Sequence, residues 1–432
     1  MKRERTERYG FETRQVHAGV PPEPVTGARQ TPIFQSAAYV FHDSDHAASL
    51  FNLQTYGFLY SRLANPTVAA LEEKIASLEG GRGATCAATG HAAQILALFP
   101  LMQPGDRFVS SQHLYGGSVT QFGKTFQRFA WHVDFVDSRD PNAVRAAIGP
   151  RTKAIFVETV SNPACVVADL EPLAEIARAA GIPLIVDNTL PSPYLCRPIE
   201  WGADLIVHST TKFLSGNGTT MGGALVDSGL FDWSRDGKFP ALADPEPAYH
   251  GIRFHESFGD LAFTTHAHAV GLRDLGASLA PQNAFYTLLG TETLSLRMDR
   301  HCQNAAEVAL WLERHPDVSW VAYPGLASSP YHELAKKYLP KGCGSVYTFG
   351  IRGGYDAAVR FVESCELFSH LANLGDTRSL TLHPASTTHR QLNEEQRRAA
   401  GVSPEAVRLS IGLESLDDIL ADLDQALRRA AG

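Results

Sequence analysis

The chain has 432 residues, and its 46 Asp and Glu outnumber its 38 Lys and Arg to give a formal net charge of −8. This mildly acidic balance argues against a nucleic-acid-binding protein, which usually presents a broad positive surface. Charged residues are 19% and hydrophobic residues 44% of the chain, as expected of a globular protein with a large core and not of a disordered one.

Apolar segments in the sequence are short. The longest, Ala92 to Met102, is interrupted by Gln94 and Pro100 and does not reach the ~20 residues of a membrane-spanning helix. No apolar segment follows the charged start MKRERTERYG, so we expect no secretory signal. The six cysteines show neither CxxC nor zinc-ligand spacing: Cys86, Cys165, Cys196, Cys302, Cys343 and Cys365. These features predict a cytoplasmic enzyme with reduced thiols that acts without membrane, nucleic acid or metal.

Residues 1–66 show little periodicity and many turn-forming residues, but they are rich in aromatic side chains. The aromatic residues in the second half of this segment are Phe34, Tyr39, Phe41, Phe51, Tyr56, Phe58 and Tyr60. Aromatic residues at this density are more often buried than part of a disordered tail. We therefore predict an N-terminal arm over residues 1–66, and packing on another subunit is one way to bury its aromatic side chains.

Regular structure is expected from Asn65 onward. Asn65 suits a helix N-cap, Pro66 suits the first helical position, and apolar residues follow at helical spacing up to Gly80. Short apolar runs then alternate with helical segments, of which the clearest begins at Asp169 and stops before Gly181. The runs that predict strands are Arg107–Ser110, His132–Val136, Ala154–Val157, Leu184–Val186, Leu205–Val207 and Gly223–Val226. Continuously apolar runs indicate burial on both faces, which predicts an α/β fold with a mostly parallel sheet between helix layers.

The pattern changes after about Pro281. A long helical pattern over residues 284–314 leads into a second region of mixed structure. Its strand-like runs are residues 345–351 and 407–413, and its helical stretches are residues 355–365 and 415–430. We predict a large domain over residues 67–283 and a smaller C-terminal α+β domain over residues 284–432.

Two polar groups follow apolar runs that are close in the sequence. Asp187 ends the run LIVD, and Lys212 follows LIVHSTT. Ligands of open α/β sheets bind beyond the carboxyl ends of the strands, so both side chains are expected to point into one crevice. This pair suits pyridoxal phosphate (PLP), because the lysine can form a Schiff base and the carboxylate can keep the pyridine nitrogen protonated. The alternative is a simple ion pair that closes a strand end.

Other residues near these strand ends are suited to bind a phosphate group. Gly90 and His91 open a helix, where backbone N–H groups and the helix dipole favour an anion. Ser209 and Thr211 occupy alternate positions, so both hydroxyls could reach one phosphate. Arg62, before the first predicted helix, could clamp a phosphate with two hydrogen bonds.

Two more residues are suited to contact a flat ring. Tyr115 follows a predicted strand and could stack on a heterocycle, and Asn162 brings an amide to a further strand end. Taken singly these signals are weak. Their joint presence beside Asp187 and Lys212 favours a cofactor site over an isolated ion pair.

The whole set of motifs resembles one family. The motifs are, in chain order, YSRLANPT, ATGHAA, HLYGGS, ETVSNP, VDNT, VHSTTKFLSG, LHPASTTH and VRLSIGLE. They are similar to those of the Cys/Met-metabolism family of PLP-dependent enzymes, fold type I, from about Gly10 to the C-terminus. Residues 254–285 further resemble the O-acetylhomoserine sulfhydrylase branch of that family. The resemblance implies PLP as cofactor and a mostly parallel seven-stranded sheet.

The resemblance also implies a role for each matching residue. Lys212 is the Schiff-base lysine and later moves protons, Asp187 pairs with the pyridine nitrogen, and Tyr115 stacks on the ring and takes part in catalysis. The residues implied to bind the phosphate are Gly90, His91, Ser209 and Thr211, with Tyr60 and Arg62 of a neighbouring subunit. Asn162 is implied to lie near the 3-oxygen of the ring.

The substrate is implied to bind through its α-carboxylate to Arg408, with Ser379 nearby, and Tyr60 is expected at the same site. The implied reaction is γ-replacement, in which O-acetyl-L-homoserine and sulfide give L-homocysteine and acetate in methionine and cysteine biosynthesis. The implied assembly is a homotetramer of dimers that share active sites.

Several alternatives stay open within the same family. They are a cystathionine γ-synthase, a γ-lyase and an O-succinylhomoserine sulfhydrylase, because the sequence does not fix the acyl group or the sulfur donor. Gly117 stands where methionine γ-lyases characteristically have Cys, which argues against that activity. A catalytically idle binding protein is disfavoured because all the expected chemical residues are present.

Three further features of the sequence could suggest a function but also have a simpler, structural interpretation. His266 and His268 lie two residues apart in a predicted helix and so do not share a face, which argues against a metal site. Asn217 stands where many family members carry His, which puts any role of that side chain in doubt. The charged stretch 393–405 is interpreted as a solvated segment, with a flap over the substrate mouth as the alternative.

Overall fold

The computed structural model describes residues 8–388, 390 and 402–431. Residues 1–7 of the predicted arm and most of the charged stretch 393–405, including its interpretation as a flap, lie outside the described residues.

The helices are α2 (Phe11–His17), α3 (Ser44–Phe51), α4 (Pro66–Glu79), α5 (Gly90–Leu98), α6 (Gly116–Thr120), α7 (Pro141–Ala147), α8 (Leu170–Ala180), α9 (Ser192–Leu195), α10 (Pro240–Ala243), α11 (Phe254–Phe258), α12 (Ala262–His266), α13 (Arg273–Leu275), α14 (Pro281–Thr291), α15 (Leu294–Arg314), α16 (His332–Tyr338), α17 (Gly354–Ser364) and α19 (Leu416–Ala431).

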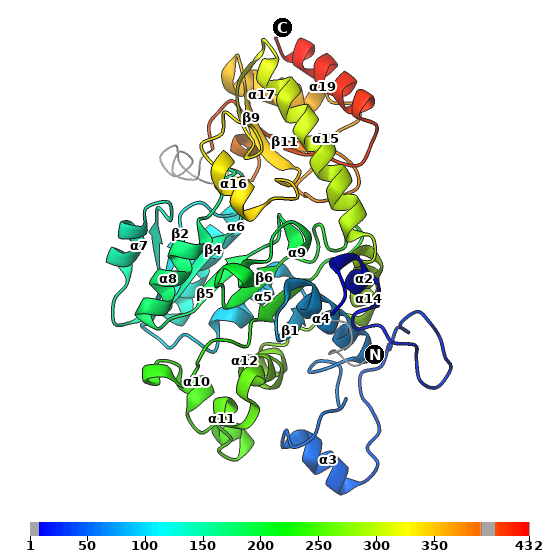
Figure 1. Cartoon of the computed structure of the whole chain (residues 1–432), viewed down its shortest axis with the longest axis vertical. Helices are drawn as coiled ribbons and strands as arrows, with labels where there is room; N and C mark the ends of the chain where they lie inside the picture. The colour runs from blue at the N-terminus through cyan, green and yellow to red at the C-terminus, as the bar shows by residue number, and fades with distance from the viewer. Residues whose placement is uncertain (1–7, 389, 391–401, 432) are drawn as a thin grey trace.

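A seven-stranded sheet lies at the centre of the molecule (Figure 1). Its strands are β1 (Gly83–Ala87), β2 (Arg107–Ser111), β3 (His132–Val136), β4 (Thr152–Glu158), β5 (Leu184–Asp187), β6 (Leu205–His208) and β7 (Gly223–Asp227). The strand order is β1-β7-β6-β5-β4-β2-β3; strands β2 to β6 run parallel, and β7 is antiparallel to both of its neighbours. The predicted α/β fold with a mostly parallel seven-stranded sheet is confirmed.

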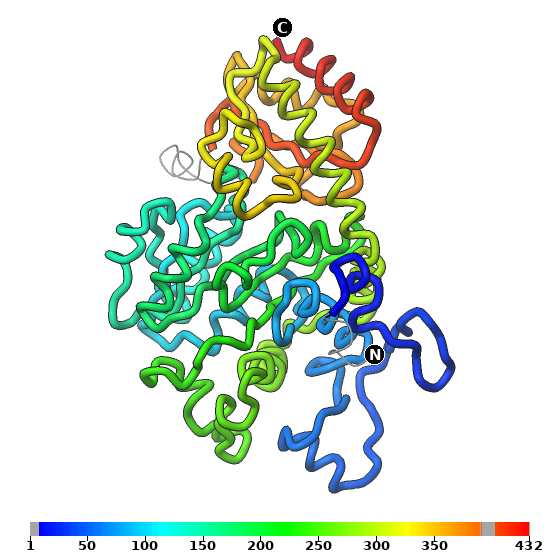
Figure 2. The backbone as a smooth tube through the Cα atoms, in the orientation of Figure 1, coloured from blue at the N-terminus to red at the C-terminus, as the bar shows by residue number. Residues whose placement is uncertain are grey.

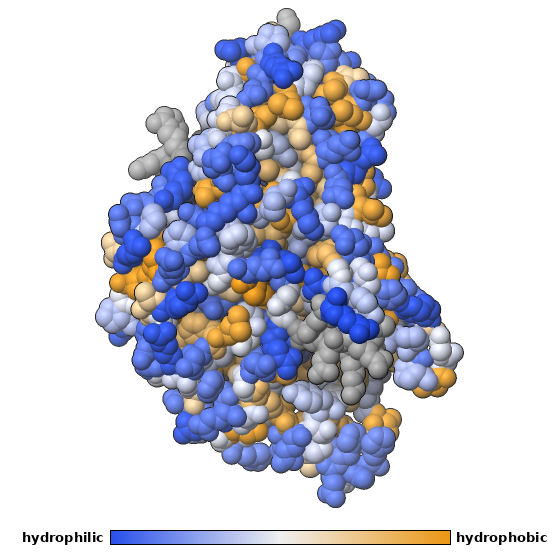
Figure 3. All heavy atoms as spheres, viewed as in Figure 1, coloured by the Kyte–Doolittle hydropathy of each residue, from blue (hydrophilic) through white to orange (hydrophobic). Residues whose placement is uncertain are grey.

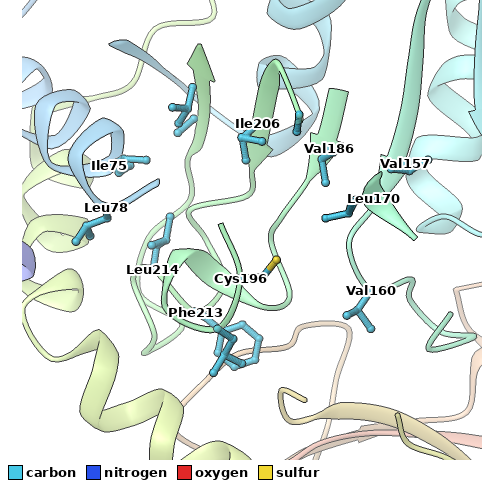
Figure 4. Close-up of a cluster of buried hydrophobic side chains, with 14 of the residues drawn as sticks. Ile75, Leu78, Val157, Val160, Leu170, Val186, Cys196, Ile206, Phe213 and Leu214 are labelled. Carbon is cyan, nitrogen blue, oxygen red and sulfur yellow. The ribbon is translucent and has the colours of Figure 1, made fainter. Parts of the chain in front are cut away.

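Helices cover both faces of this sheet because successive strand residues point to opposite sides. Val186 and Ile206 belong to the same buried cluster as Ile75 of α4, as Figure 4 shows. Ile185 and Val207, one residue away in each strand, belong instead to the cluster that contains α5. Each strand end can therefore place one side chain on the α5 face and the next on the α4 face.

Helix α4 begins and ends as its sequence predicts. The Asn65 side chain accepts a hydrogen bond from Thr67 N at 3.0 Å, and Gly80 ends the helix with a φ of 79°. Asp169 occupies the N-cap position of α8 without capping it, because its carboxylate accepts the hydroxyl of Tyr338.

A second, five-stranded sheet lies above the first in Figure 1. Its strands are β8 (Val318–Ala322), β9 (Val346–Ile351), β10 (Ser369–His370), β11 (Leu380–Leu382) and β12 (Ala406–Ser410), in the order β10-β11-β12-β9-β8. The long helix predicted over residues 284–314 is two helices, α14 and α15. The break has a physical reason, because the Arg297 guanidinium donates to Gly290 O at 2.7 Å and to Phe213 O at 2.8 Å.

Within the N-terminal arm, α2 packs against the body of the molecule through Phe11, whereas α3 lies far from the central sheet (Figures 1 and 2). The arm crosses the surface without covering its own aromatic side chains: Tyr56 is 79% and Phe51 57% exposed. Within one chain, these aromatic side chains therefore lack the burial that their density predicts.

The rest of the surface is mostly polar on the face drawn in Figure 3, with hydrophobic residues in scattered groups. All six cysteines are free, and burial raises the pKa of every one of their thiols above its ordinary value. Among the described residues, no helix is both long and apolar enough to cross a membrane.

Candidate active site

A cavity of about 330 Å³ opens where β4, β5 and β6 end, and residues of the second sheet complete its wall. It brings together nine of the residues predicted from the sequence: Gly90, His91, Tyr115, Asn162, Asp187, Ser209, Thr211, Lys212 and Arg408. This volume suits a small cofactor with part of a substrate. A larger groove of about 780 Å³ lies instead between the arm and helices α4 and α12, lined mostly by apolar side chains.

Lys212 lies in the turn after β6 and reaches into the cavity. Its Nζ donates a hydrogen bond to Asn373 Oδ1 at 2.6 Å. Burial, and to a smaller extent the positive charge of Arg408, lower the pKa of Lys212 to about 8. A lysine of this kind reaches its neutral, nucleophilic form close to neutral pH.

Asp187 is the last residue of β5 and faces the same cavity. Its Oδ1 accepts Thr189 N at 3.0 Å, and its Oδ2 accepts Gln94 Nε2 at 3.4 Å. Burial raises the pKa of Asp187, while the hydrogen bonds from Thr189 and the nearby His208 oppose that rise. A buried carboxylate with few donors is suited to pair with a cationic ring nitrogen.

The N-terminus of α5 forms the part of the cavity suited to an anion. The Thr89 side chain caps the helix by accepting Ala92 N at 3.1 Å. A Cβ added to Gly90 would lie 2.9 Å from Ser209 Cβ, so a glycine lets the helix terminus approach the Ser209 turn closely. The helix N–H groups and the Ser209 and Thr211 hydroxyls thus surround one small space.

The cavity also contains buried polar atoms that lack a partner. His91 Nε2 and Gln94 Oε1 have no hydrogen bond to any described residue, although both are buried. The His91 ring stacks near Tyr115, with ring centroids 5.9 Å apart. Buried polar atoms are normally paired, so these two indicate a polar ligand. Together with Lys212, Asp187 and the α5 terminus, the residues present fit PLP.

Arg408 projects from β12 of the second sheet into the cavity. It donates to Asn373 O at 2.8 Å and to Asn162 Oδ1 at 3.4 Å, and burial lowers its pKa to about 10. The buried guanidinium can pair with a carboxylate of a bound substrate.

Two cavity residues were missed by the sequence analysis. Asn373 contacts both Lys212 and Arg408, but it lies in LANLGD, where no strand end or helix start marks it. Glu158 ends β4 and faces the cavity beside Asp187. The argument from strand ends that selected Asp187 could have found Glu158, because it lies in the quoted motif ETVSNP.

The structure does not bring three predicted residues into the cavity of their own chain. The Ser379 hydroxyl is fully buried elsewhere, where it donates to Glu414 Oε2 at 3.0 Å and accepts Gly412 N at 2.9 Å. Tyr60 and Arg62 lie on the arm; Tyr60 is 42% exposed, and the Arg62 guanidinium lies 5.4 Å from its ring centre.

The two histidines of THAHAV have separate packing roles. His266 is buried, and burial lowers its pKa to about 4. His268 Nδ1 lies 2.8 Å from Leu63 O, and its Nε2 lies 3.4 Å from Glu72 Oε1. Within the described part of the chain, no three His, Cys, Asp or Glu residues are grouped so as to hold a metal ion.

A second polar cluster, here called the rear cluster, lies on the α4 face directly behind the cavity. It consists of Glu79, Thr159, Asn188 and His208. Glu79 Oε1 accepts Asn188 Nδ2 at 2.8 Å and lies 2.5 Å from His208 Nε2, while Thr159 Oγ1 donates to Asn188 Oδ1 at 2.8 Å. The cluster ties the end of α4 to the ends of β4, β5 and β6, and three of its members directly adjoin Glu158, Asp187 and Ser209.

Comparisons with known proteins agree with this geometry. The family model described as "Cys/Met metabolism PLP-dependent enzyme" matches residues 12–428. An O-acetyl-L-homoserine sulfhydrylase of Thermus thermophilus is 51% identical over 96% of this chain and 99% of its own. Another of that name from Leptospira meyeri is 46% identical over 96% of both chains.

A solved structure is also similar. It is described as an O-acetylhomoserine (thiol)-lyase (metY) from Campylobacter jejuni and contains N′-pyridoxyl-lysine-5′-monophosphate. It is 41% identical to this chain, covers 97% of this chain and 100% of its own, and has a TM-score of 0.95. The likeness therefore extends over the whole fold and includes a PLP-bearing lysine in the neighbour.

Proposed function

Because the chain belongs to the Cys/Met metabolism family of PLP-dependent enzymes, we propose that it converts O-acetyl-L-homoserine and sulfide into L-homocysteine and acetate. The Cγ–O bond of the substrate breaks and releases acetate, and a Cγ–S bond forms to sulfide. The observation that carries the proposal is one buried cavity that joins Lys212, Asp187 and Arg408. The names of the two sulfhydrylase relatives support this choice of substrate.

Each side chain of the cavity has a task in this reaction. When bound, PLP supplies an aldehyde carbon that reacts with amines and a ring that accepts electrons released from the substrate. Lys212, with its lowered pKa, bonds to the cofactor in the resting enzyme and then moves protons at the substrate Cα and Cβ. Asp187 pairs with the ring nitrogen, and Tyr115 stacks on the ring and assists proton transfer at Cβ.

The remaining residues bind and orient. Gly90 and His91 at the α5 terminus, with Ser209 and Thr211, hold the phosphate, and Asn162 lies at the ring oxygen. Arg408 binds the α-carboxylate, and Asn373 takes the supporting position that Ser379 was expected to have, because Asn373 contacts both Arg408 and Lys212.

The assembly and location are part of the proposal. We propose a homotetramer of dimers in which Tyr60 and Arg62 of one subunit reach the phosphate and substrate site of its neighbour. Their position outside their own cavity and the exposed aromatic side chains of the arm support this arrangement. Six free cysteines support a reducing, cytoplasmic location.

The chain is proposed to divide into an arm (1–66), a large PLP-binding domain (67–283) and a C-terminal domain (284–432). The two separate sheets support the last boundary, since α15 leads from one sheet to the other.

The test is a substrate panel with the purified holoenzyme. O-Acetyl-, O-succinyl- and O-phosphohomoserine are each supplied with sulfide, methanethiol or cysteine, and the products are identified by mass. Homocysteine formed fastest from O-acetylhomoserine and sulfide is the expected result. The Lys212→Ala variant should lose both the visible cofactor band and turnover. Methionine is also supplied alone. Faster formation of cystathionine from cysteine, or release of a ketoacid from methionine, would contradict the proposal in favour of a cystathionine γ-synthase or a γ-lyase.

A further inference from the structure

The cavity contains a second carboxylate to which the reaction above gives no task. Glu158 is the last residue of β4, is 7% exposed and lines the cavity. In the parallel pairing of β4 with β5, Glu158 lies directly opposite Asp187. Since both residues also lie on the α5 face, two acids stand side by side at the cofactor site.

Glu158 uses both of its oxygens to hold other cavity residues. Oε1 accepts Tyr115 N at 2.7 Å, and Oε2 accepts Asn162 N at 3.1 Å. Tyr115 and Asn162 lie on different loops, one after β2 and one after β4, and neither loop is regular structure at that point. One side chain therefore fixes the position of two residues that face the ring.

The ionisation of Glu158 depends on burial, on Asp187 and on its two N–H donors. Burial raises the pKa of Glu158 well above its ordinary value, and the neighbouring Asp187 raises it further, while the two N–H donors oppose the rise. The charged or titratable groups that share the cavity are Asp187, His91, Tyr115, Lys212 and Arg408, with His208 behind the sheet. A positive ring in this cavity would favour the ionised form of both acids.

We propose that Glu158 is a positioning residue for the PLP-dependent reaction: it holds Tyr115 and Asn162 against the ring, and when the positive ring ionises it, it places a second negative charge beside Asp187. This inference rests on the proposed function for its effect on turnover. Glu158 acts through the surroundings of the cofactor, so its effect on the pH midpoint of the visible cofactor band can be measured without substrate.

The experiment uses the holoenzyme of Glu158→Gln. An amide offers one acceptor oxygen, so the N–H of either Tyr115 or Asn162 loses its partner, and we expect kcat to fall about 10- to 100-fold. Loss of the negative charge should also lower the pH at which the visible band of the bound cofactor titrates, because a nearby anion favours the protonated form of a cation. Glu158→Asp, which keeps the charge, should restore that pH midpoint while restoring kcat only in part.

The matched control is Asp227→Asn. Asp227 is also a strand-end carboxylate, 1% exposed, whose Oδ1 accepts Gly229 N at 2.9 Å and whose pKa burial raises to about 7, but it does not line the cavity. The Asp227→Asn variant should change neither the pH midpoint of the cofactor band nor kcat per folded molecule. A Glu158→Gln enzyme with the wild-type midpoint and kcat, or a control that shifts equally, would overturn the inference. The midpoint is recorded without substrate, so it decides the role of Glu158 even if the proposed substrate is wrong.

Discussion

Lys212 combines two properties that a Schiff-base lysine needs: a place inside the cavity and a pKa lowered to about 8 by burial and by Arg408. Its hydrogen bond to Asn373 Oδ1 also restricts where Nζ can point. Because the neutral amine is the reactive form, the chemistry of this residue depends on pH in a range that can be measured.

The rate at which PLP adds to the apoenzyme should therefore rise with pH up to about 8 and level off above it. The measurement is the growth of the visible cofactor band after mixing, at a series of pH values. Lys74 is a matched control, since it is another buried lysine with a pKa lowered to about 8, but outside the cavity. Lys74→Met should leave the pH profile unchanged, and a profile that still rises steeply up to pH 10 would contradict the lowered pKa of Lys212.

At this scale the sequence predicted most of the cavity residues at or after strand ends, although it missed Glu158 at the end of β4. Asp187 and Lys212 follow apolar runs, so their meeting at one sheet edge could be deduced from the fold class. Asn373 comes from a loop of the second sheet, and its approach to Lys212 depends on how the two sheets are placed. Ser379 was predicted near Arg408, but its hydroxyl bonds to Glu414 and Gly412 and does not line the cavity.

At the scale of elements, the rear cluster joins α4 to three strands through side chains that have no access to water. Glu79 and His208 are both fully buried, so their pairing has to compensate for the loss of hydration. The cluster therefore joins the end of α4 to the ends of β4, β5 and β6, next to the cavity residues Glu158, Asp187 and Ser209.

Glu79→Ala should lower the free energy of unfolding by about 3–5 kcal/mol, because it leaves His208 Nε2 buried without its partner and reduces Asn188 Nδ2 to one acceptor, Cys196 O. Denaturant unfolding of the holoenzyme measures the loss. The comparison is Glu171→Ala, which removes the exposed partner of Lys337 and should cost at most about 1 kcal/mol. Equal losses in the two variants would show that the rear cluster adds no more stability than a surface ion pair.

The sequence predicted the helices of the large sheet well where caps mark them, as Asn65 and Gly80 do for α4. It predicted one helix over residues 284–314 because the apolar spacing continues through the break between α14 and α15. That break depends on a hydrogen bond from Arg297 to Gly290 O and on the close approach of Gly290 to the Ser215 carbonyl, neither of which leaves a local signal.

At the scale of the whole molecule, the arm is the segment whose aromatic side chains are left exposed in one chain. Tyr60, Phe51 and Tyr56 remain exposed, and the groove of about 780 Å³ runs along the same segment. The sequence predicted that these aromatic side chains are buried, but it contains no information on where a second copy lies. The shared active site consequently remains a prediction.

Mixing two inactive variants tests whether active sites are shared between subunits. If Arg62 acts across subunits, an Arg62→Ala chain and a Lys212→Ala chain, unfolded and refolded together, should form assemblies with one intact site and regain activity. Lys212→Ala mixed with Asp187→Ala is the control and should stay inactive, because both residues line the cavity of one chain. If Arg62→Ala alone is inactive and its mixture with Lys212→Ala stays equally inactive, Arg62 does not serve the site of a neighbouring subunit.

The raised thiol pKa values have a consequence for an enzyme whose proposed substrate is sulfide. Solutions of sulfide exposed to air accumulate polysulfides; a cysteine thiolate attacks their sulfur chain, becomes a persulfide and releases the shortened polysulfide. Burial keeps all six cysteines in the protonated form at neutral pH, and the protonated form is a poor nucleophile. Burial of the thiols would thereby limit their reaction with by-products of the proposed substrate.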